Sequence, residues 1–179
     1  MDFIRYIDES VVNFMSKTLK NDFFDVVMPY VTLIGEAGVF WILCALIMIC
    51  FRATRKAGFV CALSMLIDFI LCNVLIKNIV DRVRPDQLLW NAALIFLPSD
   101  ASFPSGHTAI SFAAAAAIFT QNKKIGIFAL IIAALVGFSR LYLCVHWLSD
   151  VIFGALLGSI CAVTAHFMIK IIYNKSSLK

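Results

Sequence analysis

Charged residues are scarce in this chain of 179 residues. They account for 15% of the sequence, whereas hydrophobic residues account for 62% and the mean hydropathy is +0.94. Soluble domains normally carry a larger share of charge, and here the apolar residues fall in long blocks suited to membrane-crossing helices. The composition therefore argues against an ordinary soluble domain and predicts a single-domain integral membrane protein.

Signatures of several other protein classes are also lacking. The six cysteines are scattered without the paired spacing of a metal site, so we expect neither zinc nor a disulfide framework. The basic residues do not gather on one soluble face, which argues against nucleic-acid binding. There is no internal repeat. We expect no cleavable signal peptide, because the first twenty residues lack a continuous apolar core and carry Asp2, Arg5, Asp8 and Glu9.

The segment 1–34 is predicted to lie at the membrane surface. Residues 2–20 have the pattern of an amphipathic helix, with an apolar stripe opposite a polar face that includes Asp8. Residues 23–34 form a second apolar piece, interrupted by Asp25 and Pro29. At helical rise it is only about 18 Å long, against a hydrocarbon thickness of roughly 30 Å. We interpret it as a partly inserted approach to the first span, with a sixth crossing left open.

The rest of the chain predicts an all-α polytopic membrane helix bundle over residues 35–172, followed by a basic cytoplasmic tail at 173–179. A polar connection at 78–106, with a short surface helix near 92–97, separates the second span from the third. The alanine run 113–117 suits close helix packing. The five predicted spans cover residues 33–51, 57–77, 107–121, 125–140 and 147–172.

Loop cations predict the orientation, because cytoplasmic loops carry an excess of lysine and arginine. One side of the predicted bundle receives Arg52, Arg55, Lys56, Lys123, Lys124, Lys175 and Lys179. The other side receives Lys77, Arg82, Arg84 and Arg140. We expect the first group in the cytoplasm, so that the amino end and the second group face outside.

Polar clusters that topology does not explain all fall on that outer side, at the ends of three separate loops. They are Lys77-x6-Arg84-Pro85, Pro104-Ser105-Gly106-His107 and Ser139-Arg140-x5-His146-x3-Asp150. Each cluster alone has an ordinary explanation, such as helix capping or a lysine that anchors a span at the interface. Together they bring three cations and two histidines to one membrane depth, which capping does not require.

Each member of these clusters has a use if the ligand is a phosphate. Lys77, Arg84 and Arg140 can neutralise the charge that gathers on phosphoryl oxygens. Ser105 and Gly106 begin a helix, where backbone N–H groups and the helix dipole favour an anion.

The two histidines supply the chemistry. His107 can donate a proton to a leaving oxygen. His146, with Asp150 one helical turn further on, can attack phosphorus through the imidazole nitrogen that the carboxylate does not hold. Two further polar residues inside apolar runs, Asp68 and His166, are interpreted as structural.

At these residues the chain resembles the type 2 phosphatidic acid phosphatase family of membrane lipid phosphatases, whose three-part signature it matches at 77–85, 104–107 and 139–150. The resemblance covers roughly residues 57–172 in layout. It implies metal-independent hydrolysis without a cofactor, with His146 as nucleophile, His107 as general acid and Asp150 as the orienting carboxylate. It also implies a set of phosphate ligands, which are Lys77, Arg84, Ser105, Gly106 and Arg140.

The compact chain resembles bacterial members that dephosphorylate undecaprenyl pyrophosphate, so we expect a lipid phosphate substrate at the outer face of a bacterial plasma membrane. Phosphatidylglycerol phosphate and phosphatidic acid are rival substrates, because phosphate chemistry does not encode the lipid tail. A lipid phosphotransferase and a non-enzymatic anion-binding membrane protein stay open as other classes. The oligomeric state is not predicted.

Overall fold

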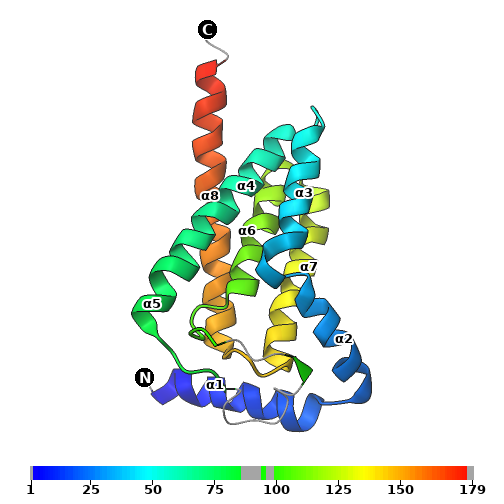
Figure 1. Cartoon of the computed structure of the whole chain (residues 1–179), viewed down its shortest axis with the longest axis vertical. Coiled ribbons are helices and arrows are strands. Elements are labelled where there is room, and N and C mark those ends of the chain that lie inside the picture. The colour runs from blue at the N-terminus through cyan, green and yellow to red at the C-terminus, as the bar shows by residue number, and fades with distance from the viewer. Residues whose placement is uncertain (1, 86–93, 96–98, 177–179) are drawn as a thin grey trace.

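The computed structural model describes residues 2–85, 94–95 and 99–176, and every regular element within them is helical (Figure 1). The predicted all-α bundle is confirmed to this extent. In chain order the α-helices are α1 (Asp2–Phe14), α2 (Asp22–Leu33), α3 (Val39–Cys50), α4 (Arg55–Phe69), α5 (Lys77–Val80), α6 (Gly106–Gln121), α7 (Lys123–Tyr142) and α8 (Leu148–Ser176). Short π-helical and 3-10 segments join some of them, at η1 (Met15–Leu19), η2 (Glu36–Gly38) and η3 (Ile70–Ile76).

Helix α6 forms the centre of the bundle and packs against α4, α7 and α8. Its alanines are the reason that the neighbours approach so closely: Ala113, Ala114, Ala115 and Ala117 are all fully buried. On α8, a side chain at Gly158 would place its Cβ 2.1 Å from the Ala109 carbonyl oxygen. The small residues on both helices therefore set the α6–α8 contact, as expected from the alanine run.

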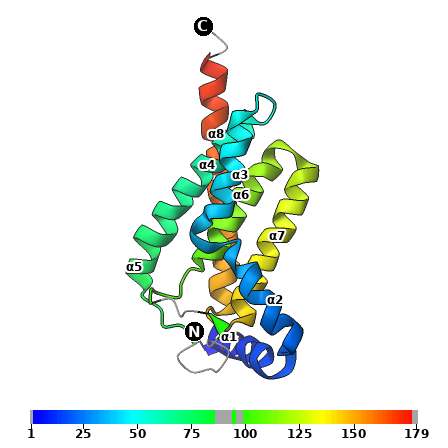
Figure 2. The same cartoon turned by 45° about the vertical axis from the view of Figure 1, so that its right-hand side comes forward.

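Three continuous helical stretches are long and apolar enough to cross a membrane, namely Arg55–Val80, Lys123–Tyr142 and Leu148–Asn174. A fourth candidate is a bent pair, Asp22–Leu33 with Glu36–Cys50. The second half is bent by 41° away from the direction of the first. Figure 2 shows α2 leading into α3 through this bend. The predicted count of five spans stays a prediction, since α6, at 16 residues, is shorter than these stretches.

The bend changes the interpretation of residues 23–34. We expected a partly inserted approach to a first span at 33–51, and in the structure residues 22–33 form the first half of the bent pair. Pro29 lies inside α2 without ending it. The break comes instead at Ala37 and Gly38, where φ is 46° and 67°. A side chain at Gly38 would also collide with Ile110, 2.3 Å away.

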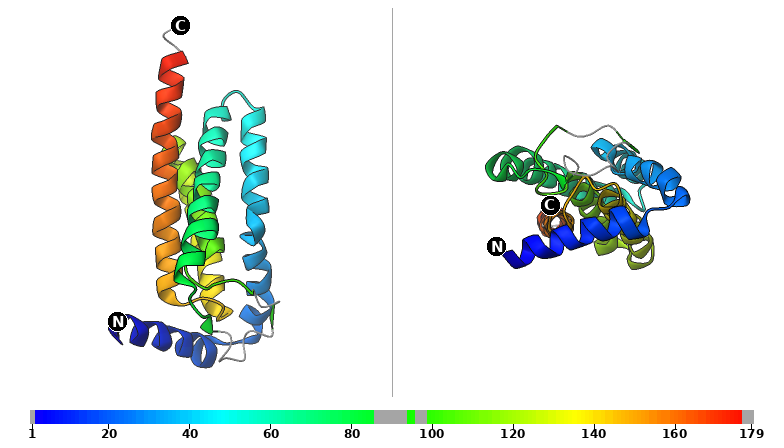
Figure 3. Two further views of the ribbon diagram at one scale, coloured as in Figure 1. Left: turned by 60° about the vertical axis from the view of Figure 1, so that its left-hand side comes forward. Right: turned by 90° about the horizontal axis from the view of Figure 1, so that it is seen from below.

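Helix α1 lies across one end of the bundle, roughly at right angles to the long helices (Figures 1 and 3). Val12 of α1 and Met15 of η1 pack with Leu141 and Cys144 around the end of α7, while Phe3 and Tyr6 of α1 are exposed. Residues 2–19 are helical as α1 and η1, while the expected amphipathic helix in the membrane interface stays a prediction. The position of Asp8 differs from the prediction, because we expected its side chain on the solvent side but only 1% of it is exposed. The polar face of α1 that carries Asp8 packs against the start of α8.

Different segments of the chain lie at the two ends of the bundle. The carboxyl end of α8 and the turn between α3 and α4 lie at one end, and α1 lies at the other (Figure 1). The three motif segments reach the α1 end, at the start of α6, at α5 and at the connection from α7 to α8. Among the described residues the structure separates the cations into the two predicted groups, with Lys179 outside the described part of the chain, and the side that faces the cytoplasm stays a prediction.

Candidate active site

A cavity of about 960 Å³ lies where the three motif segments meet. One wall is polar and comes from α5, the connection after it, the start of α6 and the connection from α7 to α8. The opposite wall comes from α2 and η2, which no motif covers. The lining of the whole cavity includes six of the predicted site residues, Lys77, Arg84, Gly106, His107, Arg140 and His146.

The start of α6 points into this cavity, so its free backbone N–H groups and positive dipole end face any bound anion. Gly106, the first residue of α6, allows a close approach from the preceding helix. A Cβ at this position would lie 3.2 Å from Asn73 Oδ1 and 3.6 Å from Lys77 Nζ. The glycine thus leaves room for the lysine beside the helix terminus.

His146 is held in one orientation beneath the cavity, and only 1% of it is exposed. Arg84 Nη1 lies 3.1 Å from its Nε2. A guanidinium can only donate hydrogen bonds, so Nε2 must carry the lone pair and Nδ1 the hydrogen. Nδ1 faces Ser102 and Asp150, with Asp150 Oδ2 at 3.5 Å. The imidazole therefore presents an unprotonated nitrogen toward the cations of the cavity.

The surroundings of His146 also favour its neutral form. Burial comes first, followed by the positive charges of Arg140, Arg84 and Lys77, and together they hold the pKa of His146 well below its usual value. A neutral imidazole is the form that can attack phosphorus.

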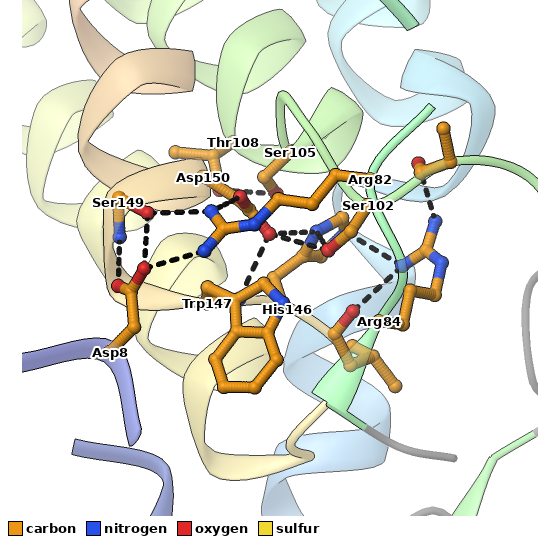
Figure 4. A network of polar contacts seen from close by, with 12 residues as sticks. Asp8, Arg82, Arg84, Ser102, Ser105, Thr108, His146, Trp147, Ser149 and Asp150 are labelled. Atoms are coloured by element: carbon orange, nitrogen blue, oxygen red, sulfur yellow. Dashed lines mark hydrogen bonds and ion pairs between the residues drawn. The ribbon is translucent and has the colours of Figure 1, made fainter. Parts of the chain in front are cut away.

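Asp150 sits behind His146 and is fully buried. Its Oδ1 accepts a hydrogen bond from Arg82 Nη1 at 2.6 Å. Its Oδ2 accepts from Ser102 Oγ at 2.5 Å and from the Trp147 backbone N–H at 2.9 Å (Figure 4). The carboxylate is thus anchored from several sides at ion-pair distance from the histidine, an arrangement suited to the orienting role predicted for it.

Two of the three predicted phosphate-binding cations are paired with an acidic side chain. Lys77 and Arg84 both contact the carboxylate of Asp100, with Arg84 Nη2 at 2.7 Å from Oδ1. Partial burial would raise the pKa of Asp100, but hydrogen bonding and charge from Lys77, and then Arg84, outweigh it and lower the pKa to about 2. An internal carboxylate therefore occupies cations that a phosphate would need.

The α2–η2 wall brings polar side chains to two further motif residues, Arg140 and His107. Arg140 Nη1 donates a hydrogen bond of 2.6 Å to Thr32 Oγ1. Glu36 Oε2 lies 3.1 Å from His107 Nε2. Both contacts join the amino-terminal third of the chain to the site.

Ser105 is placed differently from the other predicted ligands. Its hydroxyl is buried and lies 2.9 Å from Thr108 Oγ1, and its backbone N–H donates to the Asp150 carbonyl oxygen at 3.2 Å. It does not line the cavity. In this structure Ser105 links α6 to α8, and its role as a phosphate ligand stays a prediction.

Several contributors to the site were not predicted as site residues. Arg82 was assigned only to the outer cations. The others carried no motif, and their roles come from contacts between segments far apart in the chain: Asp8, Thr32, Glu36, Asp100 and Ser102. Within the described residues, no three His, Cys, Asp or Glu side chains are grouped so that they could hold a metal ion.

The two residues set aside from the site lie outside this cavity. Asp68 is buried in α4, and its carboxylate has no hydrogen-bond partner among the described residues. His166 Nδ1 lies 2.7 Å from Gln121 Nε2, between α8 and the far end of α6. This contact agrees with a structural role for His166.

A buried histidine, a buried carboxylate and clustered cations thus surround one cavity in a helical bundle with membrane-compatible helices. The family model described as the PAP2 superfamily matches residues 54–174, and the chain belongs to this family. The recognition made from the three motifs is confirmed.

Relatives and solved structures agree with this assignment. An undecaprenyl-diphosphatase of Sulfolobus acidocaldarius is 38% identical over 121 residues, which are 66% of this chain and 58% of that protein. The crystal structure of Aquifex aeolicus LpxE matches with a TM-score of 0.77 at 25% identity, over 88% of this chain and 93% of that one. The PAP2-type phosphatidylglycerolphosphate phosphatase of Bacillus subtilis matches with a TM-score of 0.74 at 28% identity, over 98% and 88%.

Proposed function

We propose that this protein is a membrane lipid phosphatase that hydrolyses a phosphate or pyrophosphate through a phosphohistidine at His146. The observation that carries the proposal is the position of His146 Nε2, 3.1 Å from Arg84 Nη1 in a cavity that also contains Lys77, Arg140 and His107. A nucleophile with its lone pair among cations suits attack on an anionic phosphorus centre.

In the first step, the Nε2 lone pair forms a bond to the terminal phosphorus, and the bond from phosphorus to the leaving oxygen breaks. Protonated His107 gives its proton to that oxygen. Asp150, facing Nδ1, stabilises the positive charge that the imidazole acquires. The cations and the α6 terminus stabilise the equatorial oxygens of the transition state.

In the second step, water attacks the phosphorus of the phosphohistidine and gives a proton to His107, which the first step left neutral. The N–P bond breaks, its electron pair returns to Nε2, and inorganic phosphate leaves. In this scheme Lys77, Arg84 and Arg140 supply the positive charge, so the reaction is proposed to need no metal ion.

We propose undecaprenyl pyrophosphate as the substrate, converted to undecaprenyl phosphate. The Sulfolobus relative is an undecaprenyl-diphosphatase, which supports this choice. The cavity also has an apolar portion suited to the lipid beside the phosphate, lined by Leu33, Phe69, Leu94, Ile95 and Ile110. Phosphatidylglycerol phosphate is the second candidate, supported by the Bacillus neighbour.

For topology we propose five crossings, formed by the bent α2–α3 pair, the stretch Arg55–Val80, α6, α7 and α8. An odd count agrees with α1 and the carboxyl end lying at opposite ends of the bundle (Figure 3). The positive-inside rule then puts the site on the extracytoplasmic face of a bacterial plasma membrane, with α1 in the interface.

The test is phosphate release by the purified protein in detergent from undecaprenyl pyrophosphate, phosphatidylglycerol phosphate and phosphatidic acid, with EDTA present. His146→Ala should abolish turnover, and His166→Ala, the control, should retain it. Substrate labelled on the terminal phosphate should leave alkali-stable label on the wild type and none on His146→Ala. Hydrolysis by His146→Ala would remove the assigned nucleophile, and a preference of more than tenfold for another lipid would replace the proposed substrate.

A further inference from the structure

Arg82 joins two buried carboxylates that are 142 residues apart in the chain, Asp8 of α1 and Asp150 of α8. Its Nη1 lies 2.6 Å from Asp150 Oδ1, and its Nη2 lies 2.7 Å from Asp8 Oδ2. Figure 4 shows the guanidinium lying between the two acids. One planar cation therefore satisfies both carboxylates at once, a geometry that lysine cannot reproduce.

Asp8 is also bonded directly to the start of α8. Its Oδ1 accepts from the Ser149 backbone N–H at 2.8 Å, and its Oδ2 accepts from Ser149 Oγ at 2.6 Å. Ser149 Oγ in turn accepts from Arg82 Nη1 at 2.7 Å. The side chain of Asp8 is 2% exposed and that of Asp150 is fully buried, so water contributes little to solvating either charge.

Arg82 also positions a second partner of Asp150. Its backbone carbonyl accepts from the Ser102 N–H at 2.8 Å, and the Ser102 hydroxyl donates to Asp150 Oδ2. The guanidinium carbon lies 5.3 Å from the centre of the Trp147 ring. Trp147 donates its own backbone N–H to Asp150. Arg82 thus holds Asp150 directly and through two of its neighbours.

We propose that Asp8 and Arg82 are positioning residues for the catalytic step, and that α1 is a working part of the active site rather than only a membrane-surface anchor. The inference rests on the proposed phosphatase function. It assigns a catalytic contribution to Asp8, which precedes the 54–174 family match, and to Arg82, a position that the Lys77-x6-Arg84-Pro85 motif leaves open. Neither residue lines the cavity, so both act through Asp150.

The physical reason is charge balance behind His146. Two buried carboxylates that share a site repel each other, and one takes up a proton unless a cation separates them. Arg82 lies between the two carboxylates and balances their negative charge. Asp150 must stay anionic and close to His146 Nδ1, because the imidazole gains positive charge as the N–P bond forms. Asp8 holds the other terminal nitrogen of Arg82, Nη2, so the guanidinium cannot turn away from Asp150.

The experiment is a double-mutant cycle on kcat and KM between Asp8→Asn and Asp150→Asn. Asn is isosteric with Asp and retains an acceptor for Ser149, which protects folding. We expect Asp8→Asn to lower kcat at least about fivefold, with KM within about twofold, and to have no further effect on kcat in the Asp150→Asn background. Glu9→Gln, an exposed carboxylate on the same helix, is the matched control and should match the wild type.

Arg82→Lys and Arg82→Gln give the second arm. Lysine keeps the charge without the fork, so we expect it to recover part of the kcat that Arg82→Gln loses. Equal losses from Asp8→Asn in both backgrounds, or an unchanged kcat in Asp8→Asn, would overturn the inference. Thermal unfolding is measured for every variant. If Asp8→Asn lowers kcat and also lowers Tm by the same amount in the wild-type and Asp150→Asn backgrounds, that result would also overturn the inference. Failure of the proposed function shows separately, as hydrolysis by His146→Ala.

Discussion

Glu36 Oε2 lies 3.1 Å from His107 Nε2, and this contact ties the bend between α2 and α3 to the first turn of α6. Glu36 precedes the two residues with positive φ, Ala37 and Gly38. The sharp break in the bent pair therefore delivers a carboxylate to the proposed general acid. Burial and the charge of Arg140 disfavour the protonated imidazole of His107, and the Glu36 carboxylate opposes them, so it favours the form that must donate the proton.

The first prediction concerns Glu36→Gln. The amide keeps the size of the side chain but removes its charge, so a smaller fraction of His107 is protonated at a given pH. We expect the alkaline limb of the kcat–pH profile to move to lower pH and kcat at pH 7.5 to fall roughly threefold to tenfold, because the carboxylate is partly exposed and its effect is screened. The measurement is phosphate release at saturating substrate from pH 5 to 9.

A control for this prediction uses His107→Ala. If Glu36 acts through His107, Glu36→Gln should change nothing further in that background. An alkaline limb that stays in place in the single Glu36→Gln variant would contradict the assignment of Glu36 as the partner of His107.

Most motif residues were located correctly from the sequence because each lies at the end of an apolar run. Runs of that length must end at the membrane surface, so Lys77, His107 and His146 could be placed at one depth without knowing the packing. The cations and histidines then had a common purpose in phosphate chemistry, and the structure brings them to one cavity.

The rest of the site depends on contacts that periodicity does not encode. The pattern of residues 2–20 shows which side chains share a face, but not which face meets another helix. Asp8 was therefore expected in solvent, although it is buried against Ser149. Asp100 lies in a segment without regular structure and Glu36 begins the short 3-10 segment η2. Neither residue belongs to a motif, and Arg82 had the ordinary explanation of a loop cation. Their partners lie between 16 residues away in the chain, as with Asp100 and Arg84, and 141 residues away, as with Asp8 and Ser149.

The second prediction concerns the acid limb of the kcat/KM–pH profile. His146 must be neutral to attack, and burial, followed by the charge of Arg140, holds its pKa well below the usual value. The group therefore stays neutral as the pH falls past 6.5, and its acid limb lies lower than that of an ordinary histidine. Arg140→Gln removes a positive charge, so the limb should move upward by about one pH unit.

Lys124→Gln, on an exposed cation at the start of α7, serves as the comparison. Substrate ionisation is common to all three proteins, so a difference between their limbs reports on the enzyme. An acid limb that coincides in Arg140→Gln and the wild type would show that Arg140 does not act on the protonation of His146.

The third prediction tests the packing of α8 on α6. A methyl group at Gly158 would lie 2.1 Å from the Ala109 carbonyl oxygen and 2.7 Å from the Ala113 nitrogen, and both of these are backbone atoms that cannot rotate aside. We expect Gly158→Ala to destabilise the protein by about 1–3 kcal/mol through overpacking, seen as a lower Tm in detergent. Val163→Ala, on an exposed side chain of the same helix, should leave Tm nearly unchanged.

The fourth prediction concerns Asp100 and anion binding. Its carboxylate contacts Lys77 and Arg84, which are two of the cations proposed to bind phosphate, so a phosphate must compete with it. Because the pKa of Asp100 is about 2, it is ionised throughout the working pH range and the competition is always present. Asp100→Asn removes the competing charge, and we expect the inhibition constant for vanadate to fall about threefold to tenfold, as for an exposed ion pair reinforced by a second cation.

The ion pairs of Asp100 with Lys77 and Arg84 also predict how the stability of the protein depends on pH. The pKa of Asp100 is lowered from 3.8 to about 2 in the folded protein, so its ion pairs contribute stability above pH 3.8 and lose it as the pH falls toward 2. Asp100→Asn should therefore lower Tm at pH 7, and the difference from the wild type should shrink between pH 4 and 2. If Asp100 instead orients Lys77 and Arg84 for the substrate, Asp100→Asn would raise the vanadate inhibition constant. Vanadate titration of the two proteins at pH 7 thus decides whether this carboxylate competes with the bound phosphate or prepares its site.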